Sequence, residues 1–182
     1  SVNPDAVVYV KYINSWGDPT LEKQTAEALL SLDCDVIAQH VDSAMPQIAA
    51  EEAGKFGCGY NTDMSVEAPN AHLTAPIWHW SSVYTAEVQD LIEGKWQPVN
   101  YFLGLKENMV DISPLTKNVA EGTAEKIEEA RAKIVSGEWD VFTGPIYSNT
   151  DELVVKEGES LADGDITGGL MTKLLIKGVE VK

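Results

Sequence analysis

The feature that most constrains how this chain folds is a regular alternation of short apolar runs with segments of helical periodicity. Residues 6–13 form an almost continuous run of apolar and β-branched side chains, as expected of a strand buried on both faces of a parallel sheet. Shorter runs follow at residues 35–40 and 55–60, with a helical pattern in each interval. Strands that alternate with helices predict an α/β fold with an open, mostly parallel sheet flanked by helices.

The helical segments carry start and stop signals. Asp18 is expected to cap a first helix with Pro19 at its first position. Four apolar residues predict the buried face of that helix: Leu21, Ala28, Leu29 and Leu32. A second helix is predicted over residues 43–53, with Pro46 in its first turn and Gly54 as its end.

The pattern continues less regularly in the second half of the chain. The predicted elements are a strand over 72–77, a helix over 81–93 that ends at Gly94, a strand over 101–105 paired with 109–112, a helix over 123–136 that ends at Gly137, and a hairpin turn at 149–151. The helix over 81–93 is expected to turn four side chains inward: Tyr84, Val88, Leu91 and Ile92. A Glu129–Lys133 pair is expected on the helix over 123–136.

The charge of the chain excludes two classes of partner. Its 182 residues include 29 acidic and 13 basic side chains, which give a formal net charge of −16. Such a surface is repelled by a phosphate backbone or an anionic membrane leaflet. No apolar run approaches the roughly 20 residues that span a bilayer. Nucleic acid is therefore not expected as a partner, and direct membrane insertion of this segment is not expected either.

The cysteines and the N-terminal residues predict little special chemistry. Cys34 and Cys58 are expected to be small buried side chains rather than a disulfide, and neither has a second metal-type ligand nearby, so no metal site is predicted. Residues 1–5 have neither the charged nor the apolar region of an export signal. Any such signal or lipid-anchoring cysteine is expected to have been removed or truncated.

Aromatic, amide and carboxylate side chains follow four successive predicted strands. In an open α/β sheet, ligands bind outside the carboxyl ends of the strands, where the loops converge. The candidate ligand-binding residues at these ends are Trp16, His40, Asp42, Ser43, Asn61, Asp63 and Trp78. Stacking faces beside amides and carboxylates suit a flat heteroaromatic ligand such as a purine, and a sugar nearly as well. No glycine-rich phosphate-binding pattern is present, which disfavours nucleotides.

Each candidate also has a purely structural interpretation. Trp16 could cover the helix that follows it, and Asp42 with Ser43 could be helix N-caps. Asn61 and Asp63 could form an Asx turn. One of the alternating pair Trp78 and Trp80 is expected to be ordinary core, and two histidines, His72 and His79, are expected to be structural or exposed.

Four sequence motifs resemble a known family. YINSW at 12–16 with Asp18-Pro19, DVIAQH at 35–40, GYNTDMS at 59–65 and HLTAP at 72–76 occur in the order and spacing of the basic membrane protein family. That family comprises substrate-binding proteins of ABC importers for purine nucleosides and nucleobases. The resemblance extends over residues 3–155, including FTGPI at 142–146.

The resemblance implies a type I periplasmic-binding-protein-like fold with two lobes that enclose the ligand. Residues 1–76 and 104–182 would form the C-terminal lobe, and residues 77–103 would be a crossover segment and helix belonging to the N-terminal lobe, which is missing here. By position, Trp16 matches the stacking aromatic of the C-terminal lobe, and Asp42 with Ser43 matches the loop that closes on the ligand. Asn61 stands at an acidic ribose contact of nucleoside binders, and Trp78 stands where they carry a lysine.

The resemblance further implies an extracytoplasmic protein, periplasmic or lipid-anchored, that delivers a small purine ligand to an ABC permease without a cofactor or catalytic residues. An adenine-like free base is expected in preference to its nucleoside, because an indole at position 78 cannot serve sugar hydroxyls. Two alternatives stay open. One is the ligand-sensing domain of a regulator, and the other is a nucleoside hydrolase-type enzyme that uses Asp42 or Asp63 with His40.

Overall fold

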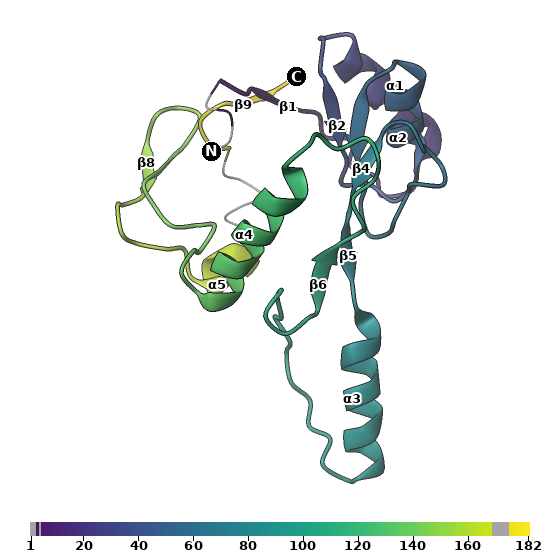
Figure 1. The fold of residues 1–182 in the computed structure, drawn as a ribbon. Coiled ribbons are helices and arrows are strands. Elements are labelled where there is room, and N and C mark those ends of the chain that lie inside the picture. Colours follow the sequence, from purple (N-terminus) through teal and green to yellow (C-terminus); the bar gives the residue numbers. More distant parts are fainter. Residues whose placement is uncertain (1–2, 4, 169–174) are drawn as a thin grey trace. The chain divides into compact units, whose positions relative to one another are not determined.

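The computed structural model describes residues 3, 5–168 and 175–182, and it contains the predicted alternation of strands and helices (Figure 1). The strands are β1 (Val8–Val10), β2 (Val36–Ala38), β3 (Phe56–Cys58), β4 (His72–Thr74), β5 (Pro76–Trp78), β6 (Val110–Ile112), β7 (Ile146–Tyr147), β8 (Leu153–Val155) and β9 (Val179–Val181). The helices are α1 (Pro19–Leu30), α2 (Met45–Glu52), α3 (Trp80–Ile92), α4 (Thr123–Ser136) and α5 (Asp163–Thr167). The chain divides into two compact units, Ile13–Val135 and Ser1–Tyr12 with Ser136–Lys182.

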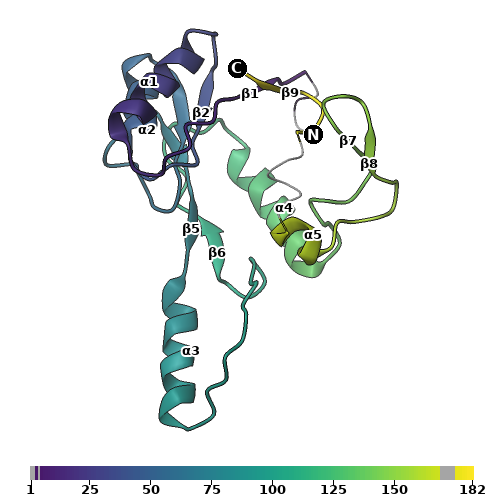
Figure 2. The same cartoon turned by 180° about the vertical axis from the view of Figure 1, so that it is seen from behind.

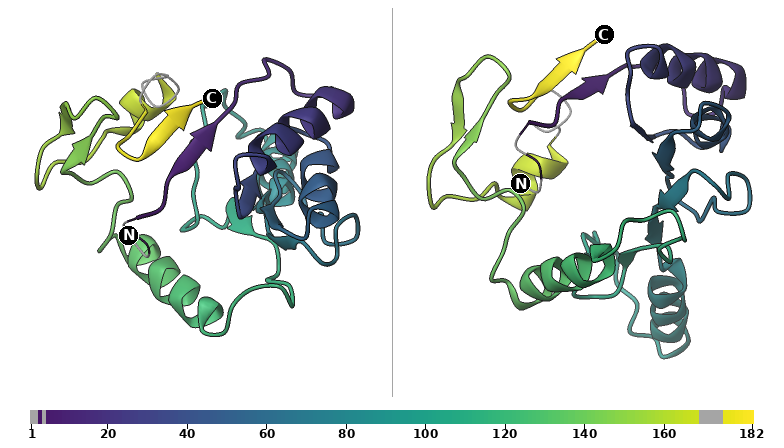
Figure 3. Two further views of the ribbon diagram at one scale, coloured as in Figure 1. Left: turned by 90° about the horizontal axis from the view of Figure 1, so that it is seen from above. Right: turned by 45° about the horizontal axis from the view of Figure 1, so that its top comes forward.

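The unit Ile13–Val135 is built on a parallel sheet in the order β2-β3-β4, with α1 and α2 packed together against it (Figures 2 and 3). The core between these layers consists mainly of small side chains: Ala26, Ile37, Ala49, Ala50, Ala68 and Ala71. Gly57 in β3 leaves room for the fully buried Gln47 of α2, since a Cβ atom at this position would overlap the Gln47 amide. The expected α/β class is confirmed.

Helix α1 begins as predicted, but its buried face differs from the expected one. The Asp18 carboxylate accepts a hydrogen bond from the Leu21 amide at 3.0 Å, with Pro19 in the first turn. The most buried residues of the helix are Glu22 and Ala26, whereas Leu32 is exposed. Leu32 does not share the helical face because the helix ends at Leu30.

The strand expected within residues 6–13 is present and pairs in parallel, but it is shorter than predicted and is not buried on both faces. Only Val8–Val10 form a strand, β1, and Val8 is 52% exposed. Among the described residues, β1 pairs only with β9, in parallel, and both strands belong to the smaller unit. An apolar run predicts a strand that could be buried on both faces, but it does not determine which strands and helices cover those faces.

The strand predicted over 72–77 is divided at Ala75. β4 pairs in parallel with β3, whereas β5 pairs antiparallel with β6. The fully buried Ala75 forms two hydrogen bonds with Ser113, through its amide to Oγ at 3.0 Å and through its carbonyl to the Ser113 amide at 2.8 Å. The predicted pairing of 101–105 with 109–112 is wrong, because 101–105 is not a strand and β6 binds β5 instead.

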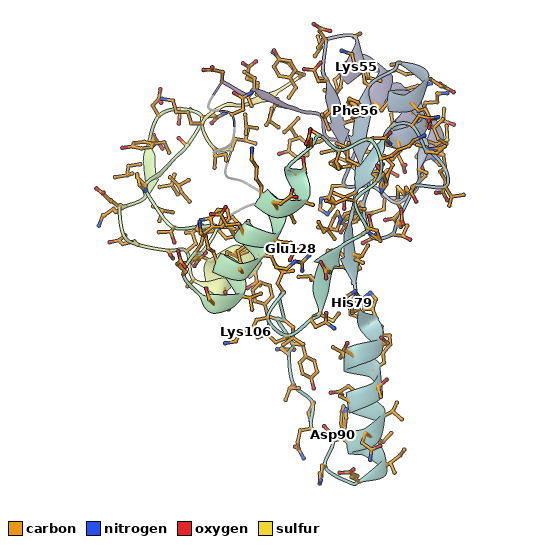
Figure 4. All side chains as sticks on the ribbon, viewed as in Figure 1. Lys55, Phe56, His79, Asp90, Lys106 and Glu128 are labelled. Atoms are coloured by element: carbon orange, nitrogen blue, oxygen red, sulfur yellow. The ribbon has the colours of Figure 1, made fainter. Side chains whose placement is uncertain are left out.

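Helix α3 follows β5 directly and begins at Trp80, one residue earlier than predicted (Figures 1 and 4). Its expected end is confirmed, because Gly94 has a φ of 68° after the last turn. The four side chains expected to point inward are not buried against any described element, and Leu91 is 66% exposed. The proposed assignment of residues 77–103 to another lobe would explain this apolar surface.

The remaining predicted elements are present. α4 spans the expected residues and carries the Glu129–Lys133 ion pair at 2.7 Å. Its Arg131 Nη2 lies 2.5 Å from Asp111 Oδ1 of β6, and the hydrogen bond from this guanidinium is the main reason that the pKa of Asp111 is lowered. The predicted hairpin is formed by β7 and β8. Cys34 and Cys58 are free.

Candidate functional site

Four aromatic rings from different segments meet beyond the carboxyl ends of β2 and β3. We call Trp16, His40, Tyr60 and Trp78 the aromatic cluster. The His40 ring meets the Tyr60 ring edge-on with centroids 4.4 Å apart, and Trp16 meets His40 edge-on at 5.0 Å. Tyr60 also stacks on Trp16 at 6.2 Å and meets Trp78 edge-on at 6.1 Å. The strand ends therefore converge, as the sheet topology predicts.

Asn61 connects the aromatic cluster to a carboxylate. Its Oδ1 accepts a hydrogen bond of 2.6 Å from the Trp78 indole N–H, and its Nδ2 donates one of 3.2 Å to Asp42 Oδ1. The backbone is held as well, because Asn61 has a φ of 65° and forms a parallel bridge with Ile77. The amide group of Asn61 thus determines how Trp78 and Asp42 face each other.

The loops that follow β1 and β2 are joined directly. The Asp42 amide donates a hydrogen bond of 3.0 Å to the Trp16 carbonyl. Asp42 does not cap α2, whose N-cap residue is Ala44. Five of the seven sequence-predicted residues, Trp16, His40, Asp42, Asn61 and Trp78, therefore lie in one connected group.

Ser43 and Asp63 are engaged elsewhere. The Ser43 hydroxyl and amide both donate to the carboxylate of Glu22 in α1. Asp63 Oδ1 accepts a bond of 2.9 Å from the Ser65 amide, which is the Asx turn that the sequence allowed, and lies 3.6 Å from His72 Nε2. Their role toward a ligand stays a prediction.

A buried polar group lies beneath the loop that carries Asn61. His72 is fully buried, and its Nδ1 lies 3.4 Å from Gln47 Oε1. Burial lowers the pKa of His72, and this outweighs the opposing effect of Asp63 and Glu67. For Asp63 burial acts to raise the pKa, but hydrogen bonds from Ser65 and the nearby His72 make the net change a decrease.

Three residues of this region escaped the sequence reasoning. Tyr60, which contacts the other three rings, directly precedes Asn61 at the end of β3, so the strand-end argument could have included it. Gln47 and Glu22 are polar residues in the first turns of α2 and α1. Nothing in the sequence distinguishes such buried polar residues from solvent-exposed ones.

The arrangement presents two kinds of group to a ligand, an exposed aromatic side chain and a carboxylate oxygen without a protein partner. Trp16 is 56% exposed, so an aromatic face is open for stacking. Across the described part of the chain, Asp42 has no ion-pair partner, and its second carboxylate oxygen accepts no bond from the protein. It can therefore accept an N–H or O–H donor from a ligand. In residues 3, 5–168 and 175–182 no His, Cys, Asp and Glu side chains are grouped to hold a metal ion.

Comparison with known proteins gives the family. The model of the Bmp family, described as ABC transporter substrate-binding protein PnrA-like, matches residues 1–143. This chain belongs to the Bmp family. The Bmp family is one of substrate-binding proteins, in agreement with the resemblance found in the sequence motifs. The described helices include none that is long and apolar enough to cross a membrane.

Two curated relatives agree with membership in the Bmp family. A purine-binding protein of Brucella abortus (strain 2308) is 36% identical over 92% of this chain and 48% of its own length. A putative ABC transporter glucose-binding protein of Haloferax volcanii is 32% identical over 90% of this chain and 42% of its own length. The chain thus spans about half the length of the curated relatives it matches.

Solved structures support the fold. A transcriptional activator of the comK gene from Bacillus halodurans matches 71% of this chain and 47% of its own with a TM-score of 0.64 and 20% identity. An ABC transporter solute-binding protein from Conexibacter woesei matches 71% of this chain and 44% of its own with a TM-score of 0.59 and 16% identity. At these identities the likeness concerns the α/β binding-protein fold alone.

Proposed function

We propose that this chain is the C-terminal half of an extracytoplasmic receptor that binds a purine base and delivers it to an ABC permease. The observation that carries this proposal is the aromatic cluster joined through Asn61 to the carboxylate of Asp42. Aromatic faces stack on a heterocycle, while Asp42 accepts a hydrogen bond from a ring or exocyclic N–H. The name of the Brucella relative agrees with this ligand class.

Trp78 favours a free base over a nucleoside. The indole has a single N–H, and this group already donates to Asn61 Oδ1 at 2.6 Å. No donor is therefore left at position 78 for a ribose hydroxyl. Each ribose hydroxyl that is buried without a partner costs about 1 to 3 kcal/mol.

A sugar is the second candidate ligand, because the Haloferax relative is named a glucose-binding protein. Sugars also stack on aromatic rings and donate to carboxylates. The dense aromatic cluster favours the purine, because a flat heterocycle stacks on aromatic faces, whereas a monosaccharide presents several hydroxyls that all need partners when buried.

The lobe assignment is part of the same proposal. Residues 1–76 and 104–182 would form one lobe, and the segment 77–103 would pack on the N-terminal lobe that completes the cleft. The exposed apolar face of α3 supports this assignment, since an isolated helix with that surface has no described partner. Figure 4 shows α3 with its side chains, between His79 just before its first turn and Asp90 near its last turn.

Calorimetry on the full-length protein with adenine, adenosine and glucose tests the ligand. Adenine is expected to bind with micromolar or stronger affinity, adenosine more weakly, and glucose not detectably. Tighter binding of adenosine or glucose would contradict the proposal. Chromatography after incubation with nucleosides separates it from the enzyme alternative, because a receptor forms no product. The coding sequence upstream separates it from a regulator: an export signal supports transport, and a DNA-binding module supports sensing.

A further inference from the structure

Glu22 in the first turn of α1 is a buried carboxylate with an unusual set of partners. Only 2% of the residue is exposed, and across the described residues no cation pairs with it. Its Oε1 accepts a hydrogen bond of 3.1 Å from the Asp18 amide, and its Oε2 accepts one of 3.2 Å from the Ser43 amide. The Ser43 hydroxyl donates to the same Oε2. Three donors offset the cost of burying the charge, which a single contact would not.

The partners of Glu22 stand at the bases of two loops of the candidate site. Asp18 comes two residues after Trp16, and Ser43 directly follows Asp42. The bond to Asp18 is local and could serve α1 alone as a cap. The bonds to Ser43 join residues 21 positions apart in sequence and connect one loop to the other. A direct bond from the Asp42 amide to the Trp16 carbonyl closes the same junction.

We infer that Glu22 is a positioning residue of the ligand site: it holds the loop that carries Trp16 at a set spacing from the loop that carries Asp42. The inference rests on the proposed function, in which one loop presents the Trp16 ring that stacks on the ligand and the other presents the Asp42 carboxylate that accepts its hydrogen bond. Glu22 itself does not contact the ligand. Ser43, whose hydroxyl is committed to Glu22, acts through the same junction.

Glu22→Gln in the full-length protein tests the inference. An amide has one acceptor oxygen and one NH2 group, so one of the two backbone N–H groups, at Asp18 or Ser43, loses its acceptor. Adenine affinity is expected to fall roughly tenfold, since binding sites depend on sub-ångström placement of their side chains. Glu27→Gln, the same chemical change on the exposed side of α1, is the matched control and should leave adenine affinity unchanged.

A double-mutant cycle shows whether Glu22 acts through Trp16. In the Trp16→Ala background, Glu22→Gln should weaken adenine binding much less than tenfold, because the ring that it positions is absent. An undiminished tenfold loss would overturn the inference. So would unchanged adenine affinity in Glu22→Gln with only a lower melting temperature, because Glu22 would then be no more than a helix cap.

Two further experiments test the positioning role of Glu22 if the first variant or the ligand fails. If Glu22→Gln does not fold, Ser43→Ala removes the hydroxyl that donates to Glu22 and accepts from the Met45 amide at 3.3 Å. It should weaken adenine binding about threefold, with recovery in Ser43→Thr, which restores both bonds. If the unmodified protein binds no adenine, the proposed function fails, and hydrogen exchange at the Asp42 and Ser43 amides decides the positioning separately. Faster exchange in Glu22→Gln than in Glu27→Gln supports it, and equal exchange overturns it.

Discussion

At the scale of single residues, the site depends on polar side chains that each serve two neighbours. Asn61 accepts from Trp78 and donates to Asp42, and Glu22 accepts from both Asp18 and Ser43. Glu22 is buried, so any other arrangement of its partners would leave a donor or acceptor unsatisfied, whereas Asn61 is exposed and its two hydrogen bonds are correspondingly weaker. The aromatic rings can therefore keep fixed relative positions although they stand on loops.

Trp16→Ala separates ligand stacking from structural packing. Because the residue Trp16 is 56% exposed, removal of its ring takes little from the core, and the melting temperature should change by no more than a few degrees. Adenine binding should weaken by about 1 to 3 kcal/mol, measured by calorimetry. A collapse of the melting temperature would instead show that the ring is structural.

Trp78→Lys should shift preference from adenine toward adenosine, measured as the ratio of the two dissociation constants. The substitution removes the bond to Asn61 Oδ1 and supplies an ammonium with three donors. An unchanged ratio would mean that the side chain at position 78 does not meet the sugar.

His72 gives the stability a pH dependence in a defined window. Burial lowers its pKa below the ordinary value of about 6.5, so the unfolded chain binds more protons between the lowered pKa and pH 6.5. The contribution of neutral His72 to the free energy of unfolding should therefore be complete above pH 6.5, and the free energy of unfolding should decrease as the pH falls through this window. In His72→Gln this slope should disappear from urea titrations at pH 5 to 7. An equal slope in both proteins would assign it to other groups.

At the scale of elements, the ends of strands decide where the site forms. The β4–β5 segment leaves the parallel sheet at Ala75 and then pairs antiparallel with β6, which brings Trp78 to Asn61 before α3 begins. Pro76 has no N–H to donate, so it cannot continue the hydrogen bonds of the parallel sheet, and the change of partner strand occurs at this residue. His79 lies just before the first turn of α3 (Figure 4), and its amide donates a hydrogen bond of 2.8 Å to the Met109 carbonyl.

Gly57→Ala tests the close packing of α2 on β3. The new Cβ would overlap the side chain of Gln47, which is fully buried and donates to Gln39 Oε1 and the Cys58 carbonyl at 2.9 Å each. The free energy of unfolding should fall by about 1 to 3 kcal/mol in urea denaturation. Gly17→Ala is the control with open space around its Cβ and should change it by less than about 0.5 kcal/mol. Equal effects would refute this packing argument.

At the scale of the whole molecule, the exposed apolar face of α3 is the feature that the proposed lobe assignment has to explain. The apolar residues Val88, Leu91 and Ile92 are all more than half exposed. Contiguous apolar surface of this kind marks an interaction site. A chain that spans about half of its relatives would present such a surface to the other half.

The isolated chain should self-associate or retain the N-terminal lobe as a partner. Light scattering should show species larger than a monomer of 19.8 kDa. Val88→Lys with Leu91→Lys should shift the isolated chain toward the monomer, because charges replace the apolar contact. A clean monomer of the unmodified chain with α3 exposed to solvent would contradict the expectation.

The sequence by itself determined the α/β class, the start of α1, the end of α3, both bounds of α4, and five of the residues that gather at the strand ends. These features depend on local patterns, namely periodicity, caps, prolines and glycines, which each segment carries alone. Only the tertiary structure decided that β1 pairs with β9, that β6 binds β5, that Tyr60 completes the aromatic cluster, and that Glu22 and His72 are buried. These features depend on contacts between residues far apart in the chain, and no local pattern specifies which segments will meet.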